Sequence, residues 1–385
     1  MDLPTFEGLR APSGQRLLDV VTEEAPSISD LALGTRLRRD HPAELVSAAI
    51  TQYRLREKAA AKFGADAAGM YFTHDALEQA TRASVAAHRA GQLRALGAEQ
   101  VVDLGCGIGA DLIAFARAGL SVRGIEIDPV RVAIARANLA ALGLDARIDL
   151  GDALASPIGH DEVAFIDPAR RDGSGRLTRL DQLTPSWEWT ERMLAGRAVA
   201  KMMPGIAHDA IPPGVGAEWV SERGDLVEAC LWGAGLDVPG RRATVLPGGE
   251  TIAAHEAVPH VDQPRRFIVE PDDAVIRAGL VAELGDRIDG ALLDAKIAYL
   301  TCDAPPSGDL GRWFEVVEEL PFRTKGLRAA LRERDLGTLT IKKRGVEVVP
   351  ERLIAQLKAA GSIPATLLLT RVDGQGRAFW VRPTR

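Results

Sequence analysis

The segment VVDLGCGIGAD, residues 101–111, decides the fold because it joins an apolar run to a helical pattern through a loop that contains three glycines. Glycine has no Cβ atom, so such a loop can bend tightly and let a ligand lie against its backbone. The spacing of Gly105, Gly107 and Ala110 also fits a dinucleotide site and is a weak signal by itself. Asp103 precedes the first glycine by two residues, at the predicted strand tip. A carboxylate there suits a ligand that carries an ammonium group rather than a pyrophosphate.

Strand and helix patterns alternate from Gln100 onward, which predicts an α/β domain with a parallel sheet covered on both faces. One helix is especially well defined, because Asp128 caps it, Pro129 takes its first position and Gly143 ends it. We expect strands at residues 101–104, 122–127, 146–150, 163–166, 198–202 and 226–231.

Acidic residues follow the second and third of these strands. Glu126 can accept hydrogen bonds from both hydroxyls of a ribose, whereas Asp128 is sufficiently explained as a helix cap. Asp152 can accept a hydrogen bond from an adenine amine, although ordinary turn chemistry also explains an acid at that position. Glu126 and Asp152 are therefore placed to bind a nucleoside.

Residues 101–153 resemble, in sequence, spacing and order, the cofactor motifs of class I methyltransferases that use S-adenosylmethionine. The resemblance implies a Rossmann-like methyltransferase domain with S-adenosylmethionine as its cofactor. It assigns Asp103 and Gly105 to the methionine end, Glu126 to the ribose and Asp152 to the adenine. Gly107 and Ala153 belong to the same implied set of cofactor-binding residues. A dehydrogenase of the same fold class is the alternative that the glycine spacing leaves open.

The fourth strand leads into Asp167-Pro168-Ala169-Arg170-Arg171. Its position resembles that of the loop in amine-directed nucleic-acid methyltransferases, which reads Asp or Asn, Pro, Pro, aromatic. There the acid accepts a hydrogen bond from the target amine and aligns its lone pair with the methyl group. Asp167 and Pro168 match this loop, but Ala169 and Arg170 leave it without an aromatic residue to stack on a flipped base. We expect Asp167, Pro168 and Arg170 to be catalytic, with Arg170 and Arg171 able to hold a phosphate.

The sequence Asp-Pro-Ala-Arg also occurs in methyltransferases of uracil carbon, which need a cysteine nucleophile shortly downstream. Cys230 lies inside the apolar run of residues 226–232 and is better explained as a core residue. The identity of the methylated atom therefore stays open.

The segment Met70–Thr73 resembles the one that closes over the methionine end of the cofactor in many nucleic-acid methyltransferases. The resemblance implies that Thr73 contacts the cofactor carboxylate, although a turn before a helix explains this residue equally well. Asp75 and Glu78 have the spacing of a capping box, which predicts one continuous helix over residues 76–95.

A chain of 385 residues is long enough for two or three domains. We expect a helical N-terminal domain at residues 1–70, because leucines recur at helical spacing there. The Rossmann-like methyltransferase domain should span residues 71–240, and an α+β region residues 241–385. In that region we expect helices at 326–334 and 350–360, a strand at 338–342, and a hairpin of 366–372 with 377–381, turned at 373–376.

The C-terminal run at residues 339–346, with Leu327 and Arg328 upstream, resembles the THUMP-like domain that ends certain bacterial, especially actinobacterial, methyltransferases. The THUMP domain itself binds RNA, so the resemblance implies an RNA partner, transfer or ribosomal RNA. Lys342, Lys343 and Arg344 lie at a strand end and can contact phosphates, although a solvated strand end has the same composition.

Charge is distributed unevenly along the chain. The whole chain has a net charge of −6, but residues 310–385 hold 15 basic and 8 acidic residues, a net charge of +7. The remaining 32 basic and 45 acidic residues give residues 1–309 a net charge of −13. A basic terminal module on an acidic body favours a partner that carries phosphates, but charge alone is equally compatible with a basic surface that only contacts solvent.

The overall composition, 46% hydrophobic and 26% charged, is typical of a globular protein. No apolar stretch reaches the length of a membrane span and no signal pattern is present, so we expect a cytoplasmic protein without a membrane partner. The 3 cysteines and 7 histidines have no metal-ligand spacing, so we expect no metal. Two alternatives to an RNA methyltransferase remain: a cofactor-binding RNA-binding protein with little catalysis, and a methyltransferase of a small molecule or protein.

Overall fold

The computed structural model describes residues 1–170, 180–303 and 308–384, so the predicted site residue Arg171 lies outside the described residues. The chain folds into two compact units. The first contains residues 1–202, 212–215 and 231–238, and the second contains residues 203–211, 216–230 and 239–385.

The first unit begins with four helices, which confirms the predicted helical N-terminus. Proline occupies the first position of the second helix, and Ser29 caps the third by accepting a hydrogen bond from the Ala32 amide. The long fourth helix buries residues such as Val46 and Leu55 against the other three, and it ends at Gly64, whose φ is +58°. The elements are α1 (Leu3–Arg10), α2 (Pro12–Glu24), α3 (Asp30–Leu37), α4 (Ala43–Phe63) and the 3-10 turn η1 (Gly64–Ala68).

The continuous helix expected over residues 76–95 is wrong. Two helices occur instead, α5 (His74–Gln79) and α6 (Ala83–Ala95), and Thr73 rather than Asp75 caps the first of them. At the break, Lys62 of α4 donates hydrogen bonds to the carbonyl oxygens of Leu77, Glu78 and Ala80, at 2.7, 2.8 and 2.8 Å. The carbonyl groups at a helix end have no partner within the helix, so this ammonium group stabilises an end that the local sequence does not mark.

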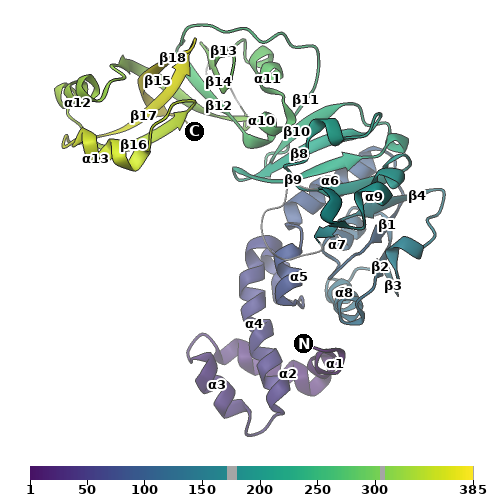
Figure 1. Ribbon diagram of the computed structural model, residues 1–385. Coiled ribbons are helices and arrows are strands. Elements are labelled where there is room, and N and C mark those ends of the chain that lie inside the picture. The colour runs from purple at the N-terminus through teal and green to yellow at the C-terminus, as the bar shows by residue number, and fades with distance from the viewer. Residues whose placement is uncertain (171–179, 304–307, 385) are drawn as a thin grey trace. The chain divides into compact units, whose positions relative to one another are not determined.

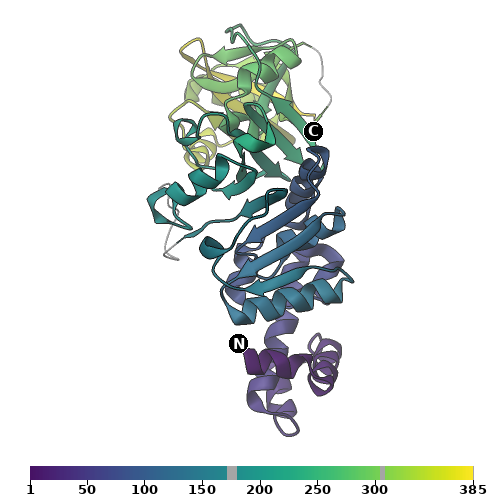
Figure 2. The same ribbon diagram turned by 90° about the vertical axis from the view of Figure 1, so that its right-hand side faces the viewer.

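A parallel sheet forms the core of the first unit, in the order β3-β2-β1-β4-β7. The central strands β1, β4 and β7 are nearly continuously buried, as expected of strands covered on both faces, whereas the last strand β3 is mostly exposed or half-buried. The strands lie side by side in Figure 2. Their bounds are β1 (Gln100–Leu104), β2 (Ser121–Glu126), β3 (Arg147–Leu150), β4 (Glu162–Ile166) and β7 (Ala198–Met202). Helix α7 (Ala110–Arg117) joins β1 to β2, α8 (Pro129–Ala141) joins β2 to β3, and α9 (Trp187–Leu194) precedes β7. The α/β fold predicted from the alternation of patterns is therefore confirmed.

The second unit contains β11, β10, β8 and residues 225–230 of β9, and these strands are neighbours in the order β11-β10-β8-β9. Their bounds are β8 (Gly216–Glu222), β9 (Asp225–Trp232), β10 (Arg241–Leu246) and β11 (Glu250–Ala253). β10 pairs with β8 in parallel and with β11 in antiparallel orientation.

A separate sheet of seven strands completes the second unit, in the order β13-β14-β12-β15-β18-β17-β16. Its strands are β12 (Phe267–Pro271), β13 (Ala291–Asp294), β14 (Ile297–Cys302), β15 (Gly311–Leu320), β16 (Leu336–Arg344), β17 (Ile363–Val372) and β18 (Gln375–Pro383). The helices are α10 (Asp273–Ala278), α11 (Val281–Arg287), α12 (Thr324–Glu333) and α13 (Pro350–Leu357). Alternate residues of β17 point to two different cores: Leu367 and Leu369 pack with α12 and α13, whereas Leu368 packs with Phe314 and Tyr299.

Two details of this region differ from the sequence expectation. Helix α13 ends at Leu357, where Lys358 takes the left-handed conformation with φ of +47°, and does not continue to Ala360. The hairpin turn is also tighter than expected, because Val372 and Gln375 still pair and only Asp373 and Gly374, both with positive φ, form the turn.

Candidate functional site

The glycine loop after β1 leaves room for a ligand. Gly105, Gly107 and Gly109 have φ values of +99°, +56° and +85°, a conformation that residues with a Cβ atom rarely adopt. A Cβ atom added at Gly105 or Gly107 would meet no other atom within 4 Å, so open space lies beside the backbone at both positions. The amides of Gly105 and Cys106 both donate to the Ile125 carbonyl, which anchors the loop to the end of β2.

Asp103 lies at the end of β1 with only 2% of its surface exposed. Among the described residues, no hydrogen bond reaches its carboxylate. Burial raises the pKa of Asp103 well above its usual range, and the negative charges of Asp111, Asp167 and Glu126 raise it further, while Arg89 opposes them. A buried acid in this state is stabilised when a cationic ligand binds beside it.

Glu126 is buried at the end of β2, with 5% of its surface exposed. Its carboxylate accepts hydrogen bonds from the amides of Gly107 and Asp128, both at 2.9 Å. The carboxylate therefore connects the glycine loop to the start of α8. A carboxylate has about four acceptor positions, so two amide donors still leave room for hydroxyl groups of a ligand. Asp128 caps α8 as predicted, through the amides of Val130 and Arg131.

Asp152 and Ala153 follow β3 at the same edge of the sheet. The exposed Asp152 caps the 3-10 turn η2 (Ala153–Ala155) by accepting a hydrogen bond from the Leu154 amide. Three large apolar side chains nearby in the chain are unusually exposed: Ile127 at 70%, Leu150 at 58% and Leu154 at 52%. Glu126 pairs with Leu150, and the Gly151 amide donates to the Glu126 carbonyl, so the two strand ends are adjacent. An apolar surface of this kind suits a flat aromatic ligand.

Two buried amide side chains hold the segment before Thr73. Gln52 of α4 both donates to the Phe72 carbonyl and accepts from the Phe72 amide, at 2.6 and 2.9 Å. Asn138 of α8 makes the equivalent pair with the backbone of Tyr71 and also donates to the Ile108 carbonyl of the glycine loop. This segment is therefore bound to the loop through Asn138. The signal in the sequence was an asparagine on the apolar face of a helix, which the sequence analysis did not use.

Thr73 itself is half-buried, and its hydroxyl accepts a hydrogen bond from the Ala76 amide as the cap of α5. The helix-cap explanation therefore holds for this residue. Its proposed contact with a cofactor carboxylate stays a prediction.

The loop after β4 carries Asp167 and Pro168, both half-buried. Ala169–Arg170 forms the short strand β5, which pairs with β6 (Leu183–Thr184). The Asp167 carboxylate accepts a hydrogen bond from the Lys201 ammonium group at 2.7 Å, and this ion pair is the main feature that the sequence analysis missed.

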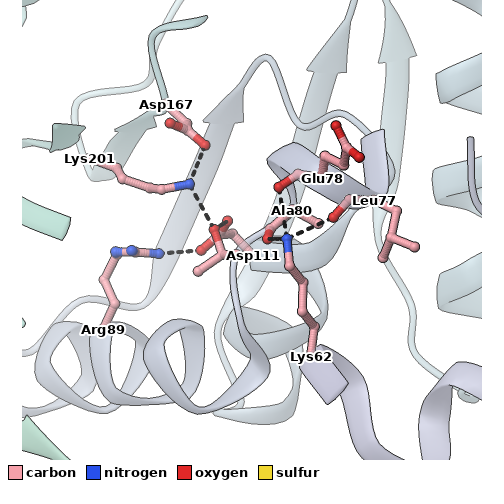
Figure 3. A network of polar contacts seen from close by, with 9 residues as sticks. Lys62, Leu77, Glu78, Ala80, Arg89, Asp111, Asp167 and Lys201 are labelled. Carbon is pink, nitrogen blue, oxygen red and sulfur yellow. Dashed lines mark hydrogen bonds and ion pairs between the residues drawn. The ribbon is translucent and has the colours of Figure 1, made fainter. Parts of the chain in front are cut away.

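Lys201 belongs to a network of charged and polar side chains in the first unit (Figure 3). Its ammonium group also donates to the Thr81 hydroxyl at 3.1 Å, and that hydroxyl donates to Asp111 at 2.7 Å. Arg89 forms an ion pair with the other oxygen of Asp111 and stacks over Phe165, with 4.7 Å between the guanidinium carbon and the ring centroid. Only 1% of Arg89, 5% of Thr81 and 7% of Asp111 is exposed. We refer to Arg89, Asp111, Thr81, Lys201 and Asp167 as the Lys201 network.

In the second unit, the three consecutive cations of β16 have different surroundings. Lys342 and Arg344 both pair with Glu270 of β12, and they lie over the rings of Phe314 and Tyr299. Lys343 points to the opposite face, as alternation along a strand requires, and it is exposed. Two of the three cations predicted to contact phosphates thus already have a carboxylate partner.

Comparison with known proteins gives three family matches. A methyltransferase domain matches residues 101–166, a THUMP domain-like family matches residues 311–383, and a domain of unknown function matches residues 2–59. Over 349 residues the chain is 40% identical to an uncharacterized S-adenosylmethionine-dependent methyltransferase of Mycobacterium tuberculosis, in two strains, covering 86% of this chain and 95% of the relative. The chain belongs to the S-adenosylmethionine-dependent methyltransferases.

A solved structure extends the similarity to nearly the whole chain. A candidate methyltransferase of Porphyromonas gingivalis W83 superposes with a TM-score of 0.78 at 23% sequence identity, covering 96% of this chain and 99% of that protein. At this identity the similarity concerns the fold. The family matches at residues 101–166 and 311–383 confirm the methyltransferase and THUMP-like resemblances noted in the sequence.

The methyltransferase uses S-adenosylmethionine as its cofactor, and the charges at the glycine loop fit this molecule. Asp103, Asp111, Asp167 and Glu126 bring four acids together, while S-adenosylmethionine carries a sulfonium and an ammonium group. Among the described residues of the methyltransferase, no group of histidine, cysteine or acidic side chains has the arrangement of a metal site. None of its described helices has the length and apolar character needed to cross a membrane.

Proposed function

We propose that this methyltransferase modifies a base of transfer or ribosomal RNA in the cytoplasm, with Asp167 positioning the nucleophile. The observation that carries the choice of RNA is the match of residues 311–383 to the THUMP domain-like family, within a segment of net charge +7 on an otherwise acidic chain. The domain boundaries near residues 70, 240 and 310 belong to this proposal.

The cofactor supplies an electrophilic methyl group on its sulfonium, so the protein has to hold the nucleophile in line with that group. In our proposal the ionised Asp103 accepts hydrogen bonds from the ammonium group, and the backbone at Gly105 and Gly107 lies against the methionine end, with Thr73 nearby. Glu126 accepts the ribose hydroxyls. Asp152 and Ala153 contact the adenine, whose faces the exposed Ile127 and Leu154 would cover.

Asp167 is the group that we assign to the nucleophile. Its carboxylate is 35% exposed and ionised in an ion pair, so it can accept a hydrogen bond from an amine of a base. Pro168 restricts the backbone that follows it. Arg170 is proposed to hold a phosphate of the same nucleotide, together with Arg171. Ala169 and Arg170 stand where the related loop continues to its aromatic residue, so these two residues do not stack on the base.

The best candidate for an RNA surface is the outer side of α12 with Lys343. Lys325, Arg328 and Arg332 are spaced by three and four residues, so they form one stripe along the helix, opposite the buried Leu327 and Leu331. All three are exposed. Arg328 also donates to the Gln356 carbonyl at α13, which leaves its other nitrogens available to a phosphate.

The proposal is tested by incubating the full chain with S-adenosylmethionine labelled in its methyl group and total bacterial RNA. We expect labelled RNA that disappears when the RNA is digested by ribonuclease beforehand, and no labelled RNA with Asp167→Ala. Label that appears in protein or small molecules after ribonuclease treatment would replace RNA with another substrate. Mass spectrometry of RNA nucleosides from a strain that lacks the protein then identifies the methylated base.

A further inference from the structure

We infer that Lys201 is a positioning residue for Asp167, and that Thr81 and Asp111 hold its ammonium group in the required place. This inference deepens the proposed function, because it rests on the assignment of Asp167 to the nucleophile. The observation behind it is the Lys201 network, which connects the loop after β4 to the break between α5 and α6 (Figure 3).

The hydrogen-bonding capacity of each group fixes the direction of every bond in this network. An ammonium group only donates and a carboxylate only accepts, whereas a hydroxyl has one hydrogen and two lone pairs. Thr81 must therefore give its single hydrogen to Asp111, and it accepts from Lys201 with a lone pair. Arg89 forms an ion pair with the other oxygen of Asp111. Rotation of this carboxylate away from Thr81 would therefore break a buried ion pair.

The ammonium group of Lys201 is consequently held between two fixed acceptors. Its second acceptor is Oδ2 of Asp167, and the Lys201 side chain is only 17% exposed. Among the described residues, Lys201 is the one hydrogen-bond donor to the Asp167 carboxylate. Oδ2 is thereby fixed, and Oδ1 is left to accept a hydrogen bond from the substrate. Without Lys201, the carboxylate would rotate freely near the negative charges of Asp103 and Asp111.

The break in the helix is what allows Thr81 to take part. Residues Ala80 and Arg82 have extended backbone, so Thr81 lies between two helices and not on the surface of one. Lys62 holds the carbonyl groups on the α5 side of the break, including that of Ala80, the residue next to Thr81. Neighbouring cations, including Lys201, add to burial in lowering the pKa of Lys62. The segment that follows Thr73 is therefore connected to Asp167 by the hydrogen bonds of Lys201 to Thr81 and Asp167.

The first test compares methyl transfer to total RNA by the full chain and its variants. Lys201→Met should lower kcat about 10- to 100-fold, the scale expected when a reacting group is misplaced, and leave the KM for S-adenosylmethionine within about 2-fold. Lys201→Arg should recover part of the loss, because a guanidinium group can also donate to Asp167. Thr81→Val, which removes both hydrogen bonds of the hydroxyl, should lower kcat more than Thr81→Ser. Lys58→Met is the matched control, since Lys58 forms only an exposed pair with Glu78.

A purely structural role for Lys201 would raise the KM for S-adenosylmethionine in Lys201→Met, with no recovery by arginine, and that result would overturn the inference. So would an unchanged kcat in Lys201→Met on RNA that the wild type methylates, which would leave the proposed function intact.

A second measurement does not require an RNA substrate. In a double-mutant cycle by thermal unfolding, Lys201→Met should lower the melting temperature of the wild type but have little or no such effect in the Asp167→Asn background. Equal shifts in both backgrounds would mean that the two residues are not coupled and would overturn the inference. If the wild type labels no RNA, the RNA proposal fails, while the cycle still supports or overturns the role of Lys201.

Discussion

The glycine-loop end of the first unit and the seven-stranded sheet of the second unit use charge in opposite ways. At the loop, four acids gather around Arg89 and Lys201, and Asp103 is buried without a donor among the described residues. On the seven-stranded sheet, arginines pair with glutamates at or near the surface: Arg334 with Glu318, and Arg377 with Glu319. Exposed pairs of this kind contribute little to stability.

This difference separates two ways of binding. A buried, uncompensated acid costs stability in the free protein and is compensated when a cationic ligand arrives. Exposed cations cost almost nothing, and they attract a polyanion from a distance, an effect that salt screens. The first arrangement selects one small molecule, and the second suits a long phosphate backbone.

The largest effect is expected from Asp103→Asn, which tests the role of the buried acid at the glycine loop. The variant keeps the shape of the side chain but removes the negative charge, so we expect the affinity for S-adenosylmethionine to fall more than about 100-fold. The ligand-free variant should also melt at a higher temperature, by roughly 2–4 °C for each kcal/mol of relieved burial cost. Calorimetry and thermal unfolding measure the two effects. Unchanged cofactor affinity in the folded variant would remove Asp103 from the site.

The raised pKa of Asp103 also predicts how ligand-free stability and cofactor affinity depend on pH. Because the folded pKa of Asp103 is raised above its unfolded value, the ligand-free protein is most stable below the unfolded pKa and loses stability as pH rises from there to the folded pKa. Cofactor binding requires the ionised acid, so affinity should increase with pH over the same window. Both trends should be absent in Asp103→Asn, and cofactor affinity that decreases with rising pH would contradict the assignment.

Glu126→Ala should weaken S-adenosylmethionine binding by about 1.5–3 kcal/mol, or roughly 10- to 150-fold, the usual value of hydrogen bonds to a charged group. The loss includes two amide donors, Gly107 of the glycine loop and Asp128 at the start of α8, which are left without their acceptor. Calorimetry with the wild type should also show that NAD binds far more weakly than S-adenosylmethionine. Tighter binding of NAD would contradict the reading of Glu126.

A triple variant tests whether exposed cations of the second unit contact RNA. In this variant, glutamine replaces Lys325, Arg328 and Arg332 of α12. Each cation that contacts a phosphate releases counterions, so the log–log dependence of RNA affinity on salt should become shallower by about 2–3. Cofactor affinity should not change, because these side chains act on phosphates. A wild-type salt slope in the triple variant would mean that α12 does not contact RNA.

The smallest effect is expected from two neighbours on β16. Lys343→Gln should make the salt slope shallower by about 0.7–0.9 with no change in melting temperature, since Lys343 is exposed. Lys342→Gln should lower the melting temperature and leave the salt slope unchanged. The reason is that Lys342 is a partner of the half-buried Glu270, so its charge is already paired. Equal slopes for the two variants would show that the pairing with Glu270 does not decide which cation meets RNA.

The sequence by itself determined the parts of the fold that depend on neighbouring residues. The glycine loop, the helix capped by Asp128 and the strands of the parallel sheet were all predictable, because strand periodicity, capping and positive φ are local properties. The predicted C-terminal helices, strand and hairpin all occur, with bounds that differ by a few residues, whereas β13, β14, β15, α10 and α11 were not predicted. The resemblance to methyltransferases came from residues 101–153, which form one continuous part of the site.

Only the tertiary structure decided which side chains meet across long separations. The break at Ala80 depends on Lys62, 18 residues earlier, and the partner of Asp167 lies 34 residues later, at Lys201. Likewise, Lys342 is paired with Glu270, 72 residues before it, which no charge count over the C-terminal segment can show. An ammonium group can donate to many different acceptors, and only the folded chain decides which acceptors lie within its reach. For that reason the sequence pointed to Asp167, while the folded chain identified what holds it.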